Sequence, residues 1–290
     1  MEEKNLQMEL DALDAEVQKQ AIEADAEMHA MAERLRIKAS DHYDEPEYTL
    51  SQNGRGFAPL GNIMALMAEM KHGKTFVNMS FAAALLHGNY LGLKAEMKDA
   101  RVLFFDTEQD LADGQRIQRR VHFVCGWDFE VDNDRFQVFH LREIPFDQRR
   151  KFIDWAVRAY KPTSVFVDGG RDLLQDFNSL EESADLIQWL MTLSSEAHCA
   201  IWTVLHVNPN SDKMRGHLGT ELGNKVTDVF RVVKKKEGCT VKFVVDHVAA
   251  RHRDVDGWTF EIDDEKPYGI PVLSDGQGEE VEQMEARISL

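Results

Sequence analysis

Residues 62–86 read NIMALMAEMKHGKTFVNMSFAAALL, and this stretch decides the fold. Its pattern predicts an apolar strand over 62–67, a polar loop, and an apolar helix over 75–86 that Gly88 ends. The same order of strand, loop and helix recurs downstream. Strands are expected at 101–106, 136–141, 164–168 and 200–206, and helices up to about residue 124, at 147–160 and at 179–198. Apolar strands that alternate with helices predict an α/β fold, with a mostly parallel twisted sheet between two layers of helices.

The two ends of the chain follow other patterns. Residues 5–38 contain neither Gly nor Pro and predict one helix with a thin apolar stripe. Pro46 and Asn53–Gly56 predict a linker and a turn. Beyond residue 225, short strands at 226–233, 241–246 and 258–262 predict antiparallel hairpins at one edge of the sheet. We therefore expect an acidic helical extension and linker at 1–48, the α/β domain at 49–270, and an acidic tail at 271–290.

Composition excludes several classes of protein. The chain has 290 residues, and no apolar run approaches the roughly 18 residues that a membrane span needs. The first residues, MEEKNLQMEL, lack the apolar core of a secretory signal, so we expect a cytoplasmic protein. Three widely spaced cysteines argue against a disulfide framework or a cysteine-based zinc site. The formal net charge of -17 lies mostly in the two ends, so acidity does not exclude a nucleic-acid partner.

The loop after the first strand fits the phosphate-binding P-loop pattern from Gly73 onward. In such a loop, backbone N–H groups hold phosphates, a lysine (here Lys74) reaches the β- and γ-phosphates, and a hydroxyl (here that of Thr75) ligates Mg²⁺. Ala68 stands where the pattern has glycine, and a left-handed backbone there would cost energy. A chance Gly-Lys-Thr at a helix start is the alternative. The residues expected to bind ATP are Ala68, Glu69, Met70, Lys71, His72, Gly73, Lys74, Thr75 and Phe76.

Three polar residues lie at the ends of apolar strands. Asp168 ends SVFVD and is placed to hold Mg²⁺ together with Thr75. Glu108 follows the strand at 101–106 and could orient the water that attacks ATP. His206 ends AIWTVLH and could hydrogen-bond to the γ-phosphate. Each has a plainer alternative: an Asp that ends a strand, a solvated loop glutamate, and a structural histidine.

The ordered set of P-loop, DTE, SVFVDGGRDL, the strand ending in His206, and RGHLGTEL resembles the RecA-like ATPases. More closely, it resembles the hexameric replicative helicases of the RepA/DnaB type, in the form found among AAA-type ATPases of bacterial mobile elements. The resemblance covers about residues 49–265 and makes 49–270 the RecA-like ATPase domain. It implies that Glu108 is the catalytic carboxylate, Asp168 the metal-holding residue and His206 the γ-phosphate sensor.

The same resemblance implies a homo-oligomer, with a hexameric ring favoured, in which a basic residue from a late strand completes the neighbour's ATP site. Arg251 is the best match for that residue and Arg253 the second. A lysine that often precedes it in the helicases is replaced by Ala249.

The resemblance also implies that loops facing the ring's channel touch single-stranded DNA. Residues 208–224 would form such a loop, and the phosphate-contacting candidates are Lys213, Arg215 and Lys225. A mobile surface loop of ordinary charge is an equal alternative.

Three functional interpretations follow. The first is an ATP-hydrolysing, helicase-like motor on single-stranded DNA, in replication or mobilisation of a mobile element. The second is a regulatory or assembly ATPase with slow hydrolysis and a protein partner, recognised through the N-terminal helix. The third, a small-molecule kinase, is the least supported, because we find no arginine-rich lid segment in the sequence.

Overall fold

The computed structural model describes residues 2–207 and 216–274, and its contacts divide the chain into two units, Met1–Glu45 and Pro46–Leu290. The first unit contains helix α1 (Glu2–Leu35). This helix ends three residues before the expected position, and a turn follows in which the carboxylate of Asp41 accepts a hydrogen bond from the amide of Lys38 (2.9 Å). Among the described residues, no helix combines the length and apolarity that crossing a membrane requires.

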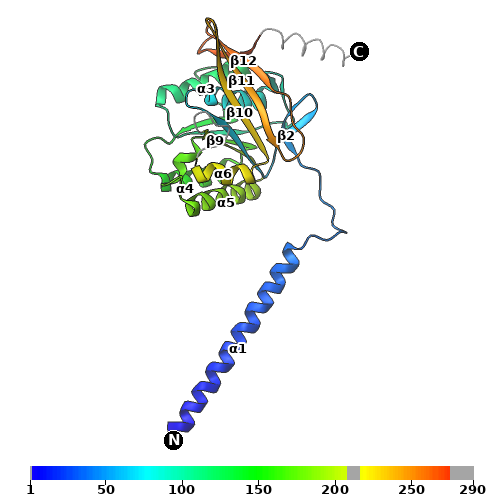
Figure 1. Cartoon of the computed structure of the whole chain (residues 1–290), viewed down its shortest axis with the longest axis vertical. Helices are drawn as coiled ribbons and strands as arrows, with labels where there is room; N and C mark the ends of the chain where they lie inside the picture. Colours follow the sequence, from blue (N-terminus) through cyan, green and yellow to red (C-terminus); the bar gives the residue numbers. More distant parts are fainter. Residues whose placement is uncertain (1, 208–215, 275–290) are drawn as a thin grey trace. The chain divides into compact units, whose positions relative to one another are not determined.

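The second unit is built on a nine-stranded sheet (Figure 1). In spatial order its strands are β13 (Ile270–Leu273), β12 (Trp258–Asp263), β11 (Thr240–Ala250), β10 (Asp228–Glu237), β3 (Ile63–Ala68), β9 (Ala200–His206), β8 (Ser164–Asp168), β6 (Val102–Asp106) and β7 (Phe136–His140). Pairing is parallel from β10 to β7 and antiparallel from β10 to β13. The expected α/β fold with an antiparallel edge is confirmed. Strand β13 was not expected, and it lies where the sequence predicted the start of the acidic tail.

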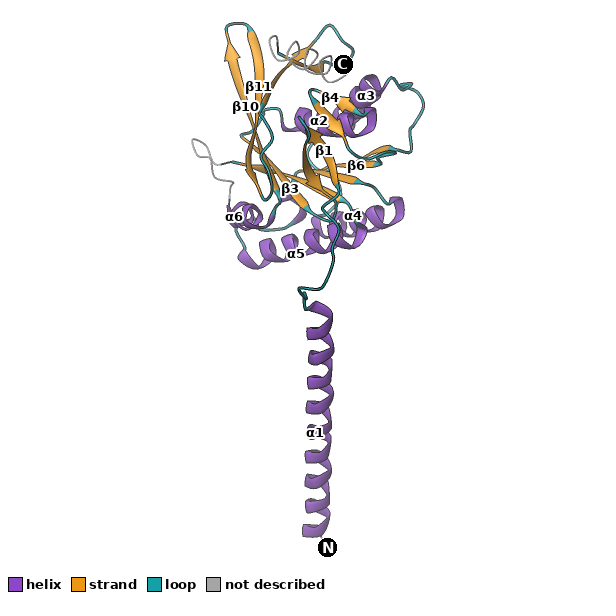
Figure 2. Ribbon diagram, turned by 90° about the vertical axis from the view of Figure 1, so that its right-hand side faces the viewer, coloured by secondary structure: helices purple, strands orange, loops and turns teal. Residues whose placement is uncertain are grey.

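Helices cover both faces of this sheet (Figure 2). Helices α2 (Lys74–His87) and α3 (Leu111–Cys125) pack on one face. On the other face lie α4 (Phe146–Tyr160), α5 (Leu180–Ala197) and α6 (Gly216–Lys225). Side chains alternate between the two cores along each strand, so that in β3 Met64 and Leu66 face α2, and Ala65 faces α5 and α6.

A second, four-stranded antiparallel sheet corrects the linker expected after Pro46. Its strands, in order, are β2 (Arg55–Pro59), β1 (Tyr48–Gln52), β5 (Leu93–Ala95) and β4 (Asn89–Tyr90). The Asn53–Gly54 turn was expected, but the segments on either side of it are strands that bury Leu50 and Phe57. Ala58 takes a left-handed backbone (φ 54°), and its N–H donates to the buried carboxylate of Asp228 (2.9 Å). This contact ties the small sheet to the large one.

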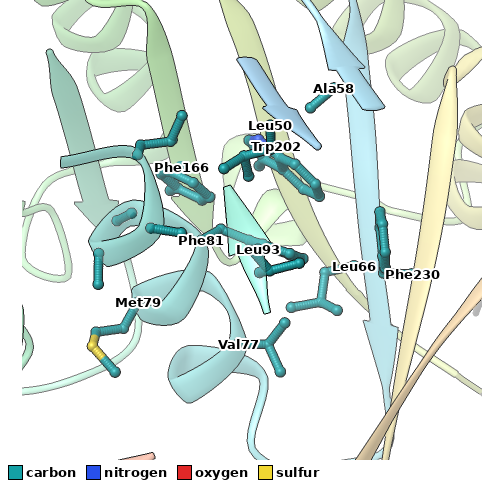
Figure 3. Close-up of a cluster of buried hydrophobic side chains, with 14 of the residues drawn as sticks. Leu50, Ala58, Leu66, Val77, Met79, Phe81, Leu93, Phe166, Trp202 and Phe230 are labelled. Carbon is teal, nitrogen blue, oxygen red and sulfur yellow. The ribbon is translucent and has the colours of Figure 1, made fainter. Parts of the chain in front are cut away.

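An aromatic cluster joins the small sheet, α2 and the large sheet (Figure 3). Trp202 of β9 is fully buried and stacks on Phe81 of α2, with ring centroids 4.4 Å apart. Phe166, its cross-strand neighbour on β8, also stacks with it at 5.9 Å, and Phe57 of β2 meets it edge-on at 6.3 Å. Trp202 is therefore the residue at which three layers of the core meet.

We expect Trp202→Ala to lower the free energy of unfolding by about 3–5 kcal/mol, since it removes a large ring and leaves a cavity among rigid neighbours. Urea denaturation followed by circular dichroism measures this change. Trp155, which is 55% exposed, gives the matched control, and Trp155→Ala should cost about 1 kcal/mol or less. Equal losses in the two variants would contradict the packing described above.

Candidate functional site

The loop that joins β3 to α2 depends on one glycine. Gly73 has a left-handed backbone (φ 86°), and a Cβ added to it would lie 2.5 Å from the Phe243 ring. Lys71 is also left-handed (φ 62°). Ala68 is not: it is the last residue of β3 and pairs with His206. The energy cost of a left-handed backbone at Ala68, where the motif has glycine, is therefore absent.

Lys74 lies at the start of α2 with its ammonium group turned back into the loop. Its Nζ is 3.4 Å from the carbonyl oxygen of Glu69 and 3.3 Å from Nδ1 of His206. Burial lowers the pKa of Lys74, and the carboxylates of Asp168 and Glu108 oppose that shift. The ammonium is thus held at the loop by weak contacts that an anionic ligand can replace.

Thr75 and Asp168 form a hydroxyl–carboxylate pair. The Thr75 hydroxyl donates to Asp168 Oδ2 (2.7 Å), and Gln109 Nε2 donates to the same hydroxyl (3.3 Å). Burial raises the pKa of Asp168 to about 6, while the Thr75 hydrogen bond acts in the opposite direction. Both groups offer hard oxygen atoms, the donors that Mg²⁺ prefers. No group of three or more His, Cys, Asp or Glu in the described ranges could hold a metal, so a Mg²⁺ here would take its other ligands from phosphates and water.

Glu108 lies just beyond β6, on a turn fixed by Asp106. One carboxylate oxygen of Asp106 accepts hydrogen bonds from the amides of Glu108 and Gln109, both at 3.0 Å. Glu108 Oε1 is 3.6 Å from His206 Nε2, and the neighbouring imidazole holds the pKa of Glu108 below its usual value. His206 therefore stands between Lys74 and an ionised glutamate.

Most of these groups, though neither Asp106 nor His206, line one cavity of about 400 Å³. Gly73, Lys74, Thr75, Glu108 and Asp168 lie at the phosphate-loop end, and the other lining residues include Phe76, Arg120, Lys234 and Phe243.

Arg120 is fixed within this cavity. Its guanidinium lies 4.5 Å from the centre of the Phe76 ring, and its Nε donates to the carbonyl oxygens of Tyr268 (2.9 Å) and Gly269 (3.1 Å). The cavity thus combines the Lys74 ammonium and the carboxylates of Glu108 and Asp168 with a ring face and a guanidinium.

Sequence reasoning missed Gln109, Arg120, Lys234 and Phe243. Lys234, on the β10–β11 hairpin, lines the cavity, and its backbone N–H points to His72 Nδ1 at 3.5 Å. No local motif marks these residues, because α3 and the β10–β11 hairpin reach the loop only through the tertiary fold. Met70, by contrast, was expected to bind ATP and is 74% exposed, outside the residues that line the cavity.

The nucleic-acid candidates fall in two places. Lys213 and Arg215 lie outside the described residues. Lys225 is the last residue of α6, so the polar loop expected up to residue 224 is helical from Gly216. The cause is visible in the sequence: Leu218 and Leu222, four residues apart, bury one face of that helix.

The two candidate arginines follow β11. The backbone N–H of Arg251 donates to Thr227 (2.8 Å), and its guanidinium donates to the carbonyl oxygen of Lys225 (3.2 Å). Arg253 is exposed. Neither lines the cavity of its own chain.

Replacement of Gly73 tests the close approach of Phe243. Gly126, whose backbone is also left-handed (φ 66°) but has no atom near a prospective Cβ, serves as the control. We expect Gly126→Ala to cost about 1–2 kcal/mol from the backbone alone. Gly73→Ala should cost a further 1–3 kcal/mol or so from the clash with the ring.

The clash can be isolated in a double-mutant cycle with Phe243→Ala, read by urea denaturation. A favourable coupling of about 1–3 kcal/mol is expected, because the smaller residue leaves room for the new methyl group. Purely additive effects would mean that the ring does not press on the loop.

Comparison with known proteins agrees with this geometry. Residues 31–212 match the family model described as AAA domain. No curated protein sequence gives a significant match. Among solved structures, a KaiC-like protein from the hyperthermophilic archaeon Pyrococcus horikoshii OT3 has a similar fold, with a TM-score of 0.51 and 18% identity over 79% of this chain and 99% of that chain. The family match spans more than half of the chain and includes the phosphate loop, Glu108, Asp168 and His206, so the chain belongs to the AAA domain family and has the RecA-like fold of P-loop ATPases.

Proposed function

We propose that this protein binds ATP with Mg²⁺ and hydrolyses it as an oligomeric motor on single-stranded DNA. The observation that carries the hydrolytic part is that Lys74, the Thr75–Asp168 pair and Glu108 line one cavity, with His206 in contact with both Lys74 and Glu108. The DNA part rests on the order of the motifs, which resembles that of the hexameric replicative helicases. From the same resemblance we propose that the motor acts in replication or mobilisation of a mobile element.

Each group has a step that fits its environment. Lys74 exchanges its contacts with Glu69 and His206 for the β- and γ-phosphates. Thr75 and Asp168 would hold Mg²⁺, which would supply positive charge to the transferred phosphoryl group. Glu108 is kept ionised by His206 and so can orient and deprotonate the attacking water. His206, once Lys74 has moved, has Nδ1 free to interact with the γ-phosphate.

We place the nucleobase against the aromatic residues of the cavity. The rings of Phe76 and Phe243 lie 6.1 Å apart, and Arg120 is anchored beside them by two backbone carbonyls. Ring faces and a guanidinium bind a base by stacking. Lys234 adds a positive charge for the ribose or the phosphates.

We place the completing arginine of the neighbouring subunit on the segment after β11. Three hydrogen bonds fix this segment. From the β1–β2 hairpin, Arg55 donates to the carbonyl oxygen of Asp254 (3.2 Å), and Asn53 donates to the carboxylate of Asp256 (3.0 Å). The amide of Val255 donates to the His247 ring (3.0 Å). The guanidinium of Arg251 is already bonded to its own chain. Arg253, for which the described residues provide no bonded partner, is therefore our first choice, and Arg251 is second.

A second candidate function is a regulatory ATPase with a protein partner, and α1 favours it. Its large apolar residues are exposed, among them Leu13, Val17 and Met28. A helix with an uncovered apolar stripe and acidic neighbours is suited to bind another protein.

Replacement of the proposed base tests hydrolysis directly. Glu108→Gln should lower kcat by about 10²–10⁴-fold, because it removes the proton acceptor, and should leave ATP affinity within about threefold. Steady-state phosphate release with and without a dT oligonucleotide, together with titration of a fluorescent ATP analogue, measures both quantities. Glu69→Gln, in the same loop but 48% exposed, should keep normal turnover.

Wild-type turnover that increases with dT and disappears in Glu108→Gln supports the motor. Slow turnover indifferent to dT would favour the regulatory ATPase. Normal turnover in Glu108→Gln would show that another group activates the water.

Mixed oligomers test the arginine in trans. Arg253→Ala alone should lower kcat by about 10³-fold or more. Mixing Arg253→Ala with Glu108→Gln subunits should restore part of the turnover, since some sites then receive Glu108 from one chain and Arg253 from the next. Arg251→Ala is the comparison and should act mainly on stability. Mixing that restores nothing, or normal turnover in Arg253→Ala, would rule out this role for Arg253.

A further inference from the structure

The turn after β8 is held unusually close to its neighbours. This turn, η1 (Gly170–Leu173), follows Gly169, whose backbone is left-handed (φ 121°) and leaves no room for a Cβ beside the Thr107 hydroxyl. Gly170 likewise leaves no room for a Cβ, here beside the Thr203 hydroxyl of β9. Arg149 of α4 donates to the carbonyl oxygen of Asp172 (2.9 Å). The backbone at Arg171 is thereby fixed, and only its side chain is free to move.

The exposed side chain of Arg171 rests on an aromatic ring. Its guanidinium carbon lies 4.0 Å from the ring centroid of Phe177. The carbonyl oxygen of Phe177 accepts a hydrogen bond from Leu218 of α6 (3.4 Å). Gly216, the first residue of α6, is left-handed (φ 76°), and a Cβ there would lie 2.7 Å from the Phe177 ring. Phe177 is therefore packed between Arg171 and the first turn of α6.

Arg171 also adjoins the proposed catalytic groups. A small cavity of about 20 Å³ is lined by Arg171, Phe177, Leu205, His206 and Leu218. His206 is the residue whose Nε2 lies 3.6 Å from Glu108. The positive charge of Arg171 contributes to the lowered pKa of Glu108, after the larger effects of His206 and Lys74. A single arginine thus lies beside both the His206–Glu108 pair and the start of α6.

We propose that Arg171 is a positioning residue that transmits the position of helix α6 to Glu108. While α6 holds Phe177 in place, the guanidinium stays on the ring and beside the His206–Glu108 pair. A ligand that shifts α6 moves Phe177, releases Arg171 and changes the position of the carboxylate that activates water. This inference rests on the proposed function, because it concerns the control of Glu108 in that reaction.

The test compares Arg171→Ala, Arg171→Lys and Phe177→Leu with wild type. Arg150→Ala is the matched control, since Arg150 makes the same kind of contact with Trp189 (5.0 Å) outside this cavity. The measurements are kcat and KM for ATP with and without a dT oligonucleotide. Arg171→Ala should lower kcat about tenfold, change KM less than threefold and abolish the response to dT. Arg171→Lys should restore most of kcat, Phe177→Leu should lose the dT response, and Arg150→Ala should match wild type.

A second readout does not depend on turnover. In protein with labelled histidines, the imidazole resonance of His206, assigned with His206→Gln, should shift in Arg171→Ala and stay in place in Arg150→Ala. Wild-type kcat and dT response in Arg171→Ala, or equal losses in Arg171→Ala and Arg150→Ala, would overturn the inference. A wild-type protein without turnover would instead overturn the proposed function, and the His206 resonance would then show whether Arg171 still acts on that pair.

Discussion

The parallel register of four central strands is the constraint on which the site depends. β3 pairs Ala68 with His206, and β6 pairs Asp106 with Asp168. Because parallel strands end at one edge of a sheet, this register brings the phosphate loop, the carboxylates and the histidine together. A slip of one residue in β8 would turn Asp168 to the opposite face and place an apolar side chain beside Thr75. The alternating apolar residues that fill the two cores therefore also fix the chemistry at the strand ends.

That register brings several carboxylates close together, and their mutual repulsion is relieved when a cation binds among them. Asp168 and Glu108 lie close to the ammonium of Lys74, and Asp106 adds a third carboxylate near them. Burial raises the pKa of both aspartates, and the charges of Asp106 and Glu108 add to the rise at Asp168. Such a site is short of positive charge when empty, and a divalent cation that arrives with a phosphate ligand corrects the shortage. The same imbalance explains why a site with only two metal-binding oxygens can still favour Mg²⁺ together with a nucleotide.

The parts that could be predicted from the sequence are those encoded locally. The apolar strands, the Gly73-Lys74-Thr75 loop and the parallel core follow from periodicity and spacing, and the roles of Glu108, Asp168 and His206 are expectations from the order of motifs. The small sheet was missed because its strands are short and partly polar and its stability comes from distant partners, such as the Ala58–Asp228 hydrogen bond. Arg120 and Phe243 were missed because only the tertiary fold brings α3 and β11 to the loop. Helix α6 could have been found, since Leu218 and Leu222 are four residues apart, but its glycines favoured a loop.

The antiparallel edge of the sheet contributes to the site through strand β11 and the segment that follows it. Strand β11 presses Phe243 against Gly73 near one end of the hairpin and runs on to Ala250, where the arginine-bearing segment begins. At about 3.4 Å per residue, Phe243 and Arg251 are roughly 27 Å apart along one strand. Asn53 and Arg55 of the β1–β2 hairpin hold the segment that follows β11, through Asp256 and Asp254, and the phosphate loop contacts the other end of the strand. If that segment enters a neighbour's cavity, as proposed, then β11 connects Phe243, in the wall of its own chain's cavity, to the arginine that completes the neighbour's ATP site. A nucleotide that moves Phe243 would then move the arginine as well, and successive sites in an oligomer would be coupled through the backbone of β11 and the hydrogen-bonded segment that follows it.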